Sequence, residues 1–114
     1  MDDVATAIAD PARRKILELL RTGPLTAGQI TAHFTISRPA VSRHLRVLRE
    51  SDLVHDETAG RRRYYALNPA ALDELADWLA RFHHTGWQHR LDALATEVHR
   101  TRREKTQQDK ENTA

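Results

Sequence analysis

The stretch ISRPAVSRHLRVLRESDLV, from Ile36 to Val54, has the pattern of a capped helix with one apolar side. Ser37 is a good N-cap, because its hydroxyl can accept a hydrogen bond from a free N–H group of the first turn. Pro39 then falls in that turn, where its missing N–H costs little. On a helical wheel one side carries Val41, Leu45 and Leu48, and we expect these three residues to be buried.

The other side of this predicted helix is basic and polar. It carries Pro39, Ser42, Arg43, Arg46 and Glu50, with Arg38 and Arg49 beside it. A shorter helix is predicted just before, because Thr26 and Gln29 fit a capping box. A short helix, a tight turn and a second helix with such a face form the layout of a helix-turn-helix, whose second helix enters the major groove of DNA. We therefore expect DNA contacts from Arg38, Pro39, Ser42, Arg43 and Arg46. Among them, Ser42 and Arg43 are expected to read bases and Arg46 to contact a phosphate.

Two short strands are predicted after this helix, LVHDE (Leu53–Glu57) and RYYAL (Arg63–Leu67). Gly60 supplies the turn between them, so the pair forms a hairpin, or wing. Arg61 and Arg62 at its tip are candidates for contacts with the minor groove or its phosphates. Tyr64 and Tyr65 point to opposite faces, which places one of them in the core and leaves open which one.

Helical segments flank these elements. Asp10 and Pro11 are predicted to cap and open a helix that ends at Gly23-Pro24, and a shorter helix precedes it. Asn68 and Pro69 are predicted to cap a last helical region. Its apolar stripe shifts by one residue before Trp87, so we expect a kink or break near Gly86.

The predicted fold is therefore mainly α with a small β-hairpin, a winged helix-turn-helix in the order α-α-α-α-β-β-α, with a further helix if the last region is broken. We expect a single domain over residues 1–99, serving DNA binding and dimerisation, and a frayed polar tail over residues 100–114.

Composition restricts the classes of function. The chain has 114 residues and no cysteine, which excludes disulfides and thiolate metal sites. No apolar run is long enough for a signal peptide or a membrane span, so we expect a cytoplasmic protein without membrane contact. The formal net charge is only +2, but the segment 38–49 holds four arginines and no acid. This local excess indicates an anionic partner, double-stranded DNA. No residue pattern of an enzyme is present.

Apolar residues at the two ends of the chain exceed what so small a domain can cover alone, which favours a homodimer. The residues expected in its interface are Val4, Ile8, Leu75, Leu79, Phe82, Trp87, Leu91 and Leu94. A ligand pocket lined by Trp78 and some of these residues is the less favoured alternative.

The sequence resembles the ArsR/SmtB family of bacterial winged-helix repressors. The resemblance is carried by DPARRKILELL (Asp10–Leu20), SRPAVSRHLRVLRESDLV (Ser37–Val54) and GRRRYYALNP (Gly60–Pro69). Trp87 and the pair Arg90-Leu91 place it nearest the metal-independent branch related to SdpR. The family implies a homodimer that represses transcription from a near-palindromic operator.

The sequence departs from the metal sensors of this family. Their cysteine motif is absent from the segment 26–33. A second family site needs a histidine where Trp78 stands, and His89 with Asp92 supplies only half of it. Adjacent His83 and His84 point about 100° apart on a helix, so they cannot easily share a metal. We therefore predict no metal and no cofactor, and the effector is not identified.

Two alternatives remain. One is a metal- or ligand-responsive repressor of the same fold. The other is a winged-helix protein-interaction module that binds no nucleic acid, which a negative face over Ser42, Arg43 and Arg46 would favour.

Overall fold

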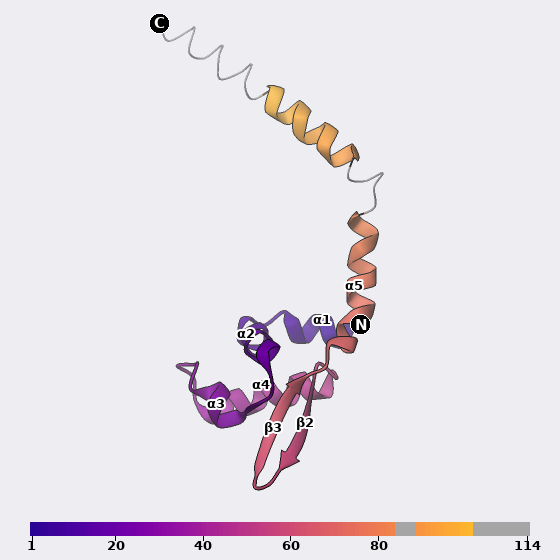
Figure 1. Cartoon of the computed structure of the whole chain (residues 1–114). Helices are drawn as coiled ribbons and strands as arrows, with labels where there is room; N and C mark the ends of the chain where they lie inside the picture. The colour runs from indigo at the N-terminus through magenta and orange to yellow at the C-terminus, as the bar shows by residue number, and fades with distance from the viewer. Residues whose placement is uncertain (84–88, 102–114) are drawn as a thin grey trace, which may run out of the picture. The chain divides into compact units, whose positions relative to one another are not determined.

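The computed structural model describes residues 1–83 and 89–101, which belong to two units, Met1–Asp77 and Trp78–Ala114. The first unit contains a winged helix-turn-helix, as predicted (Figure 1). Its elements are, in order, α1 (Asp2–Ile8), α2 (Pro11–Leu19), β1 (Leu25–Thr26), α3 (Ala27–Thr31), α4 (Arg38–Glu50), β2 (Val54–Ala59) and β3 (Arg62–Leu67).

Helix α5 (Asp73–Ala80) follows the 3₁₀ turn Pro69–Leu72 and precedes a second 3₁₀ turn, Arg81–His83. A further helix covers residues 89–101. The kink expected near Gly86 lies outside the described residues, as do Trp87 and most of the expected tail. The single domain expected over residues 1–99 stays a prediction.

The helix starts follow the capping residues that the sequence predicts. Asp10 Oδ1 accepts hydrogen bonds from the N–H groups of Ala12 (2.8 Å) and Arg13 (3.2 Å). Thr26 and Gln29 form a reciprocal capping box. Ser37 Oγ accepts from the N–H of Ala40 at 3.3 Å, with Pro39 in the first turn of α4.

The end of α4 fixes how the chain enters the wing. The Leu53 N–H donates to Leu48 O and the Asp52 N–H to Arg49 O, each over 3.0 Å. These two bonds form a Schellman motif, which requires a left-handed residue. Asp52 fills that position with φ of 63°. Only Leu53 separates this turn from β2, so the wing follows directly from α4.

Asn68 has a different role from the predicted one. It makes no side-chain cap for the turn that begins at Pro69. Its side-chain amide donates instead to Asp52 O over 2.9 Å, and its backbone N–H donates to Leu53 O over 2.9 Å. Asn68 therefore ties the end of β3 to the end of α4. It stands at the N-cap position with Pro69 next, as predicted, but its side chain does not cap the turn.

The sheet has three antiparallel strands in the order β1-β3-β2. The predicted hairpin is β2 with β3, and both strands reach closer to the tip than predicted. The tip is a two-residue turn in which Gly60 has φ of 64°, a conformation that favours glycine. β1 was not predicted, because two residues give no periodic signal.

The core of the first unit gathers side chains from all these helices and from the wing. Val41, Leu45 and Leu48 are at most 1% exposed, as their wheel positions predict. Tyr65 is buried and Tyr64 half-buried, so Tyr65 is the core tyrosine. No helix in the described parts of the chain is both long and apolar enough to span a membrane.

Candidate DNA interface

The outward side of α4 is open to solvent. Pro39, Ser42, Arg43 and Arg46 are all exposed, while Val41, Leu45 and Leu48 on the inner side fix the rotation of the helix. A serine and two arginines one helical turn or less apart can reach base edges in a major groove, since arginine can bind guanine through two hydrogen bonds.

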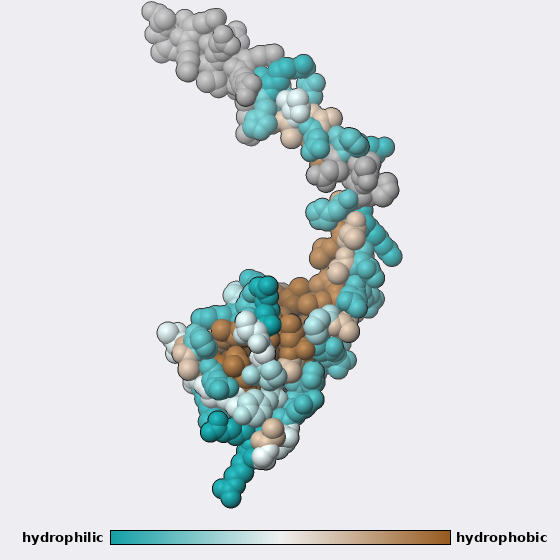
Figure 2. Space-filling model, in the orientation of Figure 1, coloured by the Kyte–Doolittle hydropathy of each residue, from teal (hydrophilic) through white to brown (hydrophobic). Residues whose placement is uncertain are grey.

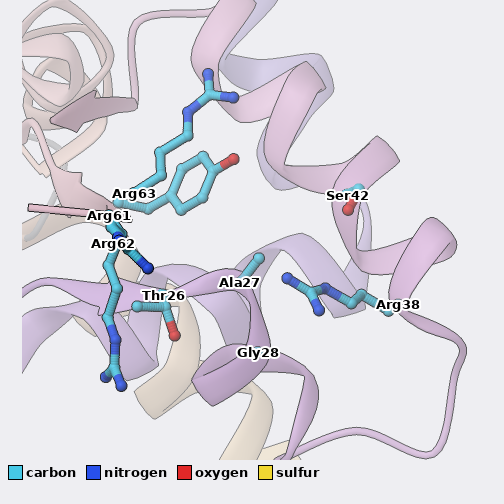
Figure 3. Close-up of a pocket in the computed structure, with 9 residues that line it drawn as sticks. Thr26, Ala27, Gly28, Arg38, Ser42, Arg61, Arg62 and Arg63 are labelled. Atoms are coloured by element: carbon cyan, nitrogen blue, oxygen red, sulfur yellow. The ribbon is translucent and has the colours of Figure 1, made fainter. Parts of the chain in front are cut away.

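A cleft of about 490 Å³ lies between the start of α4, the start of α3 and the wing (Figure 3). α4 contributes Arg38 and Ser42, and the wing contributes three consecutive arginines and Tyr65. The full lining is Thr26, Ala27, Gly28, Arg38, Ser42, Arg61, Arg62, Arg63 and Tyr65. Four guanidinium groups and no acid line it, so its chemistry suits an anion such as a DNA phosphate.

Four of the predicted DNA-contacting arginines have no protein partner. Within the described part of the chain, Arg38, Arg43, Arg61 and Arg62 make no side-chain hydrogen bond or ion pair, and all four are exposed. Arg46 differs, because its Nε donates to Glu50 Oε1 over 3.0 Å. An anion bound by Arg46 would have to compete with this bond.

The structure thus brings together only part of the predicted set. Arg38, Ser42, Arg61 and Arg62 line one cleft. Pro39, Arg43 and Arg46 lie on the exposed side of α4 and do not line it.

Arg63 is a cleft residue that the sequence reasoning did not select. It lies two residues before Tyr65, so the period-two alternation of a strand places both on one face. Arg63 Cζ lies 5.4 Å from the centroid of the Tyr65 ring. The alternation alone could not select Arg63, because the sequence does not decide which of the two tyrosines is buried and only the structure assigns Tyr65 to the core.

Arg63 also pairs with an acid. Its Nε donates to Asp56 Oδ2 over 2.5 Å, and Arg49 Nη1 lies 3.9 Å from Asp56 Oδ1. The hydrogen bond from Arg63 lowers the pKa of Asp56 below its usual value, and the charges of Arg63 and Arg49 lower it further. Asp56 in turn raises the pKa of Arg63. Asp56 is therefore ionised at neutral pH.

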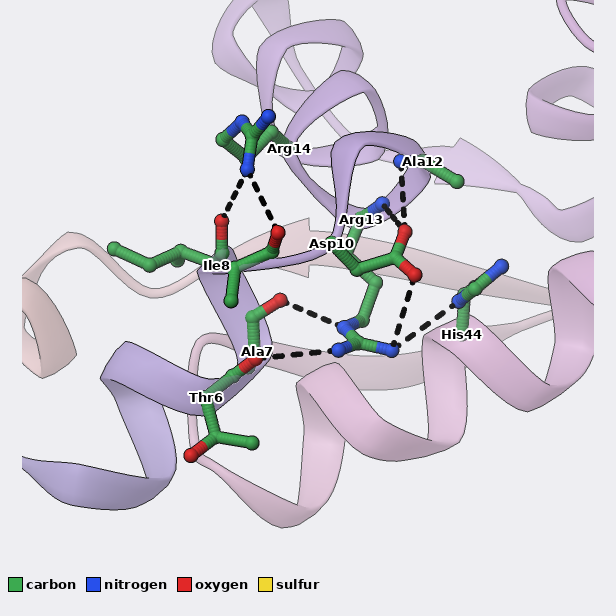
Figure 4. A network of polar contacts seen from close by, with 9 residues as sticks. Thr6, Ala7, Ile8, Asp10, Ala12, Arg13, Arg14 and His44 are labelled. Carbon is green, nitrogen blue, oxygen red and sulfur yellow. Dashed lines mark hydrogen bonds and ion pairs between the residues drawn. The ribbon is translucent and has the colours of Figure 1, made fainter.

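The inner side of α4 is held by a polar network (Figure 4). Arg13 of α2 lies 3.5 Å from His44 Nδ1 through its Nη1, and it donates to Ala7 O (2.6 Å) and Thr6 O (3.2 Å). Arg14 donates to Ile8 O (2.8 Å) and Ala9 O (3.1 Å). His44 is half-buried on this side of the helix, and the two arginines of α2 serve the fold.

The residues predicted for a dimer interface divide into two groups. Val4 is only 7% exposed and packs in the core of its own unit, so it has little surface left for a partner. Ile8 and Leu75 are half-buried against that core. The exposed members are Leu79, Phe82, Leu91 and Leu94, between 47% and 61% exposed. Trp87 lies outside the described residues.

Apolar side chains are visible along the α5 segment, whereas the wing tip is hydrophilic (Figure 2). In the second unit the Trp78 and Phe82 rings meet edge to face with centroids 4.8 Å apart. Among residues 1–83 and 89–101, no three His, Cys, Asp or Glu side chains converge as metal ligands would.

Comparison with known proteins agrees with this geometry. The sequence pattern of the arsR family of bacterial regulatory proteins matches residues 10–56. The transcriptional repressor SdpR of Bacillus subtilis is 43% identical over 86 residues, which cover 75% of this chain and 96% of that protein.

Solved structures extend the likeness to the fold. A possible transcriptional regulator for arsenical resistance superposes with a TM-score of 0.67 at 36% identity, covering 82% of this chain and 96% of that one. The homodimeric winged helix-turn-helix DNA-binding domain of a possible ArsR-family regulator from Mycobacterium bovis has a TM-score of 0.59 at 27% identity, covering 72% and 79%.

The fold and the basic face define a DNA-binding transcriptional regulator of the winged helix-turn-helix class. The chain belongs to the ArsR family. This membership confirms the resemblance found in the sequence and the expectation that the protein is not an enzyme, and it argues against a module that binds no nucleic acid.

Proposed function

We propose that this protein is a homodimeric repressor that binds a near-palindromic operator through α4 and its wing. The observation that carries the proposal is a set of exposed arginines on α4 and the wing that have no partner among the described residues, Arg38, Arg43, Arg61 and Arg62. An exposed guanidinium without an internal acid can bind a phosphate or a base without first losing another contact.

Two kinds of contact are assigned. Arg43 and Ser42 read base edges, since both are exposed on the groove side of α4 and Val41, Leu45 and Leu48 fix the direction in which that side faces. Arg38 and Arg62 hold the phosphates of the strand that passes through the cleft, with Arg61 at the tip. Such contacts set register and orientation but carry no sequence information.

The dimer is supported by the exposed apolar residues of the second unit and by the related Mycobacterium bovis domain, which is described as homodimeric. Two recognition helices related by a two-fold axis meet successive major grooves when their centres are about 34 Å apart. A bound dimer covering a promoter blocks transcription, and the related Bacillus subtilis protein is a repressor. A cytoplasmic location is part of the same proposal, and it is supported by the DNA-binding role proposed for the protein.

The proposal is tested by selecting bound DNA from a random duplex library with the full chain, followed by transcription from a promoter that carries the enriched sequence. We expect two inverted half-sites with centres about 10 base pairs apart, and less transcript as protein is added. Enrichment of no sequence would overturn specific binding. An isolated half-site, or more transcript with protein, would overturn the dimeric repressor.

A further inference from the structure

The carboxylate of Asp56 joins the recognition helix to both strands of the wing. Its Oδ2 accepts a hydrogen bond from Arg63 of β3, and its Oδ1 lies 3.9 Å from Arg49 Nη1 in the last turn of α4. Asp56 itself belongs to β2. Along the chain, α4 and β2 are linked only by the short turn at Asp52, so this side-chain link is a second connection between the same elements.

The strand register explains why these groups meet. Asp56 lies opposite Tyr65 in the hairpin, and Thr58 lies opposite Arg63. Asp56, Tyr65 and Arg63 therefore share one face of the wing. Tyr65 is buried in the core, and Arg63 Cζ lies over its ring, 5.4 Å from the centroid. Arg63 is thus held on one side by an aromatic ring and on another by a carboxylate.

A negative charge at this place works against DNA affinity in general. It lies beside a cleft lined by four arginines and neutralises one of them, Arg63. Without Asp56 the surface would have a higher affinity for DNA of any sequence, because each unpaired cation adds to the attraction for phosphates. The acid must therefore contribute something other than attraction.

We propose that Asp56 is a positioning residue, which fixes the angle of the wing against α4 so that Arg61 and Arg62 meet their phosphates while Arg43 meets its base. This inference rests on the proposed function. Asp56 touches no DNA in this role, and it acts through Arg49 and Arg63. Its contribution is to discrimination between sequences and not to affinity for DNA as such.

The neighbouring residue supplies a matched control. Glu57 carries the same charge on the same strand, but it lies on the opposite face. Its Oε1 is 3.8 Å from His55 Nε2, and no arginine within residues 1–83 and 89–101 pairs with it. Asp56→Asn and Glu57→Gln each remove one negative charge at nearly constant shape. A difference in DNA binding between these two variants therefore reflects the position of the lost charge and not the loss of charge itself.

The experiment measures affinity for the duplex enriched by selection with the unaltered protein and for a scrambled duplex, at one salt concentration. Both substitutions should strengthen binding to scrambled DNA, because a negative charge is lost. Glu57→Gln should leave the ratio of the two affinities unchanged. Asp56→Asn should lower it by at least about fivefold, the loss of one well-placed base contact, and Asp56→Glu should restore most of it.

A coupling measurement separates positioning from folding. On the selected duplex, Arg62→Ala should weaken binding less in the Asp56→Asn background than in the unaltered protein, since the wing then no longer presents Arg62 in register with Arg43. On the scrambled duplex, where no register is fixed, Arg62→Ala should cost the same in both backgrounds. A purely structural role would lower the melting temperature and leave the effect of Arg62→Ala unchanged. If Asp56→Asn and Glu57→Gln give the same ratio of affinities for the selected and the scrambled duplex, the positioning role of Asp56 is overturned. The proposed function is not affected by that result. If the unaltered protein does not distinguish the two duplexes, the proposed function fails first.

Discussion

The guanidinium of Arg13 closes the C-terminal end of α1, with its Nε donating to the main-chain oxygen of Ala7 over 2.6 Å. The last carbonyl groups of a helix have no partner within the helix. Arg13 and Arg14 donate to four carbonyl oxygens at this end, those of Thr6, Ala7, Ile8 and Ala9, of which Thr6 O also accepts from the Ala9 N–H over 3.3 Å. The same Arg13 side chain reaches His44 of α4, so one residue links α1, α2 and the recognition helix.

Replacing Arg13 by alanine should therefore lower the free energy of unfolding. The side chain is 16% exposed and its loss leaves charged hydrogen bonds unmade, so we expect a loss of about 1–3 kcal/mol. Arg21→Ala is the control, because Arg21 forms an exposed pair with Glu18, and such pairs contribute less than about 1 kcal/mol. Urea unfolding at one fixed protein concentration measures both. Equal losses for the two variants would contradict the role of Arg13.

Asp10 should give the stability a dependence on acid pH. Burial raises the pKa of Asp10, but hydrogen bonds from the Arg13 and Ala12 N–H groups and the nearby charges of His44 and Arg13 outweigh it, so the pKa is lowered. Because the pKa of Asp10 is lower in the folded than in the unfolded protein, its ionised carboxylate stabilises the folded state at pH values above the unfolded pKa of about 4. This contribution is lost as the pH falls through the pKa of Asp10 in the folded state.

Asp10→Asn tests this directly, because asparagine is also a good N-cap but does not titrate. The unaltered protein should be more stable than the variant at neutral pH, and the difference should shrink as the pH falls below about 4. Urea unfolding over a pH series gives the two curves. A difference that does not change with pH would mean that the charge of Asp10 is not involved.

The proposed dimer should depend on the exposed apolar residues. Leu79→Asp and Leu91→Asp each put a charge on a leucine that is about half exposed, and burying an unpaired charge in an interface is strongly unfavourable. Sedimentation equilibrium at micromolar concentration should give a dimer for the unaltered protein and a monomer for both variants. Asp77→Ala, half a turn from Leu75 and Leu79 on the α5 wheel, is the control and should stay dimeric. A monomeric unaltered protein would rule out the proposed interface.

Local sequence signals predicted much of this fold. Asp10, Thr26 and Ser37 cap helices through bonds to residues two or three positions away, so the sequence alone carries the information. The buried side of α4 could be predicted equally well, because its apolar residues recur with the period of a helix. β1 was missed because its two residues are held by pairing with Tyr64 and Tyr65, far along the chain.

In the candidate interface, too, residues that follow a local pattern were predicted, and residues that pair across distant segments were not. The wheel identified Ser42, Arg43 and Arg46, and the turn at Gly60 identified Arg61 and Arg62. Arg63 and Asp56 were missed, since their pairing joins two strands and the end of α4. The role of the Asn68 side chain was not predicted, because its amide donates to Asp52 O in the turn between α4 and β2. Polar side chains that serve tertiary contacts leave no periodic trace.

The central claim is that Arg43 reads a base while Arg62 holds a phosphate. Fluorescence anisotropy on the selected and the scrambled duplex across a salt series separates the two roles. Arg43→Ala should cost about 1–3 kcal/mol on the selected duplex, much less on the scrambled one, and relax selection at one base position in each half-site. Arg62→Ala should weaken both duplexes by similar factors and lower the salt slope by about one unit in each subunit.

Arg21→Ala serves as the control for a general loss of positive charge, because Arg21 is exposed and paired with Glu18 in the α2 region. It should leave both affinities nearly unchanged. We expect selective loss of binding to the chosen duplex in Arg43→Ala and uniform loss on both duplexes in Arg62→Ala. Uniform loss in Arg43→Ala together with selective loss in Arg62→Ala, or no change in either variant, would contradict it.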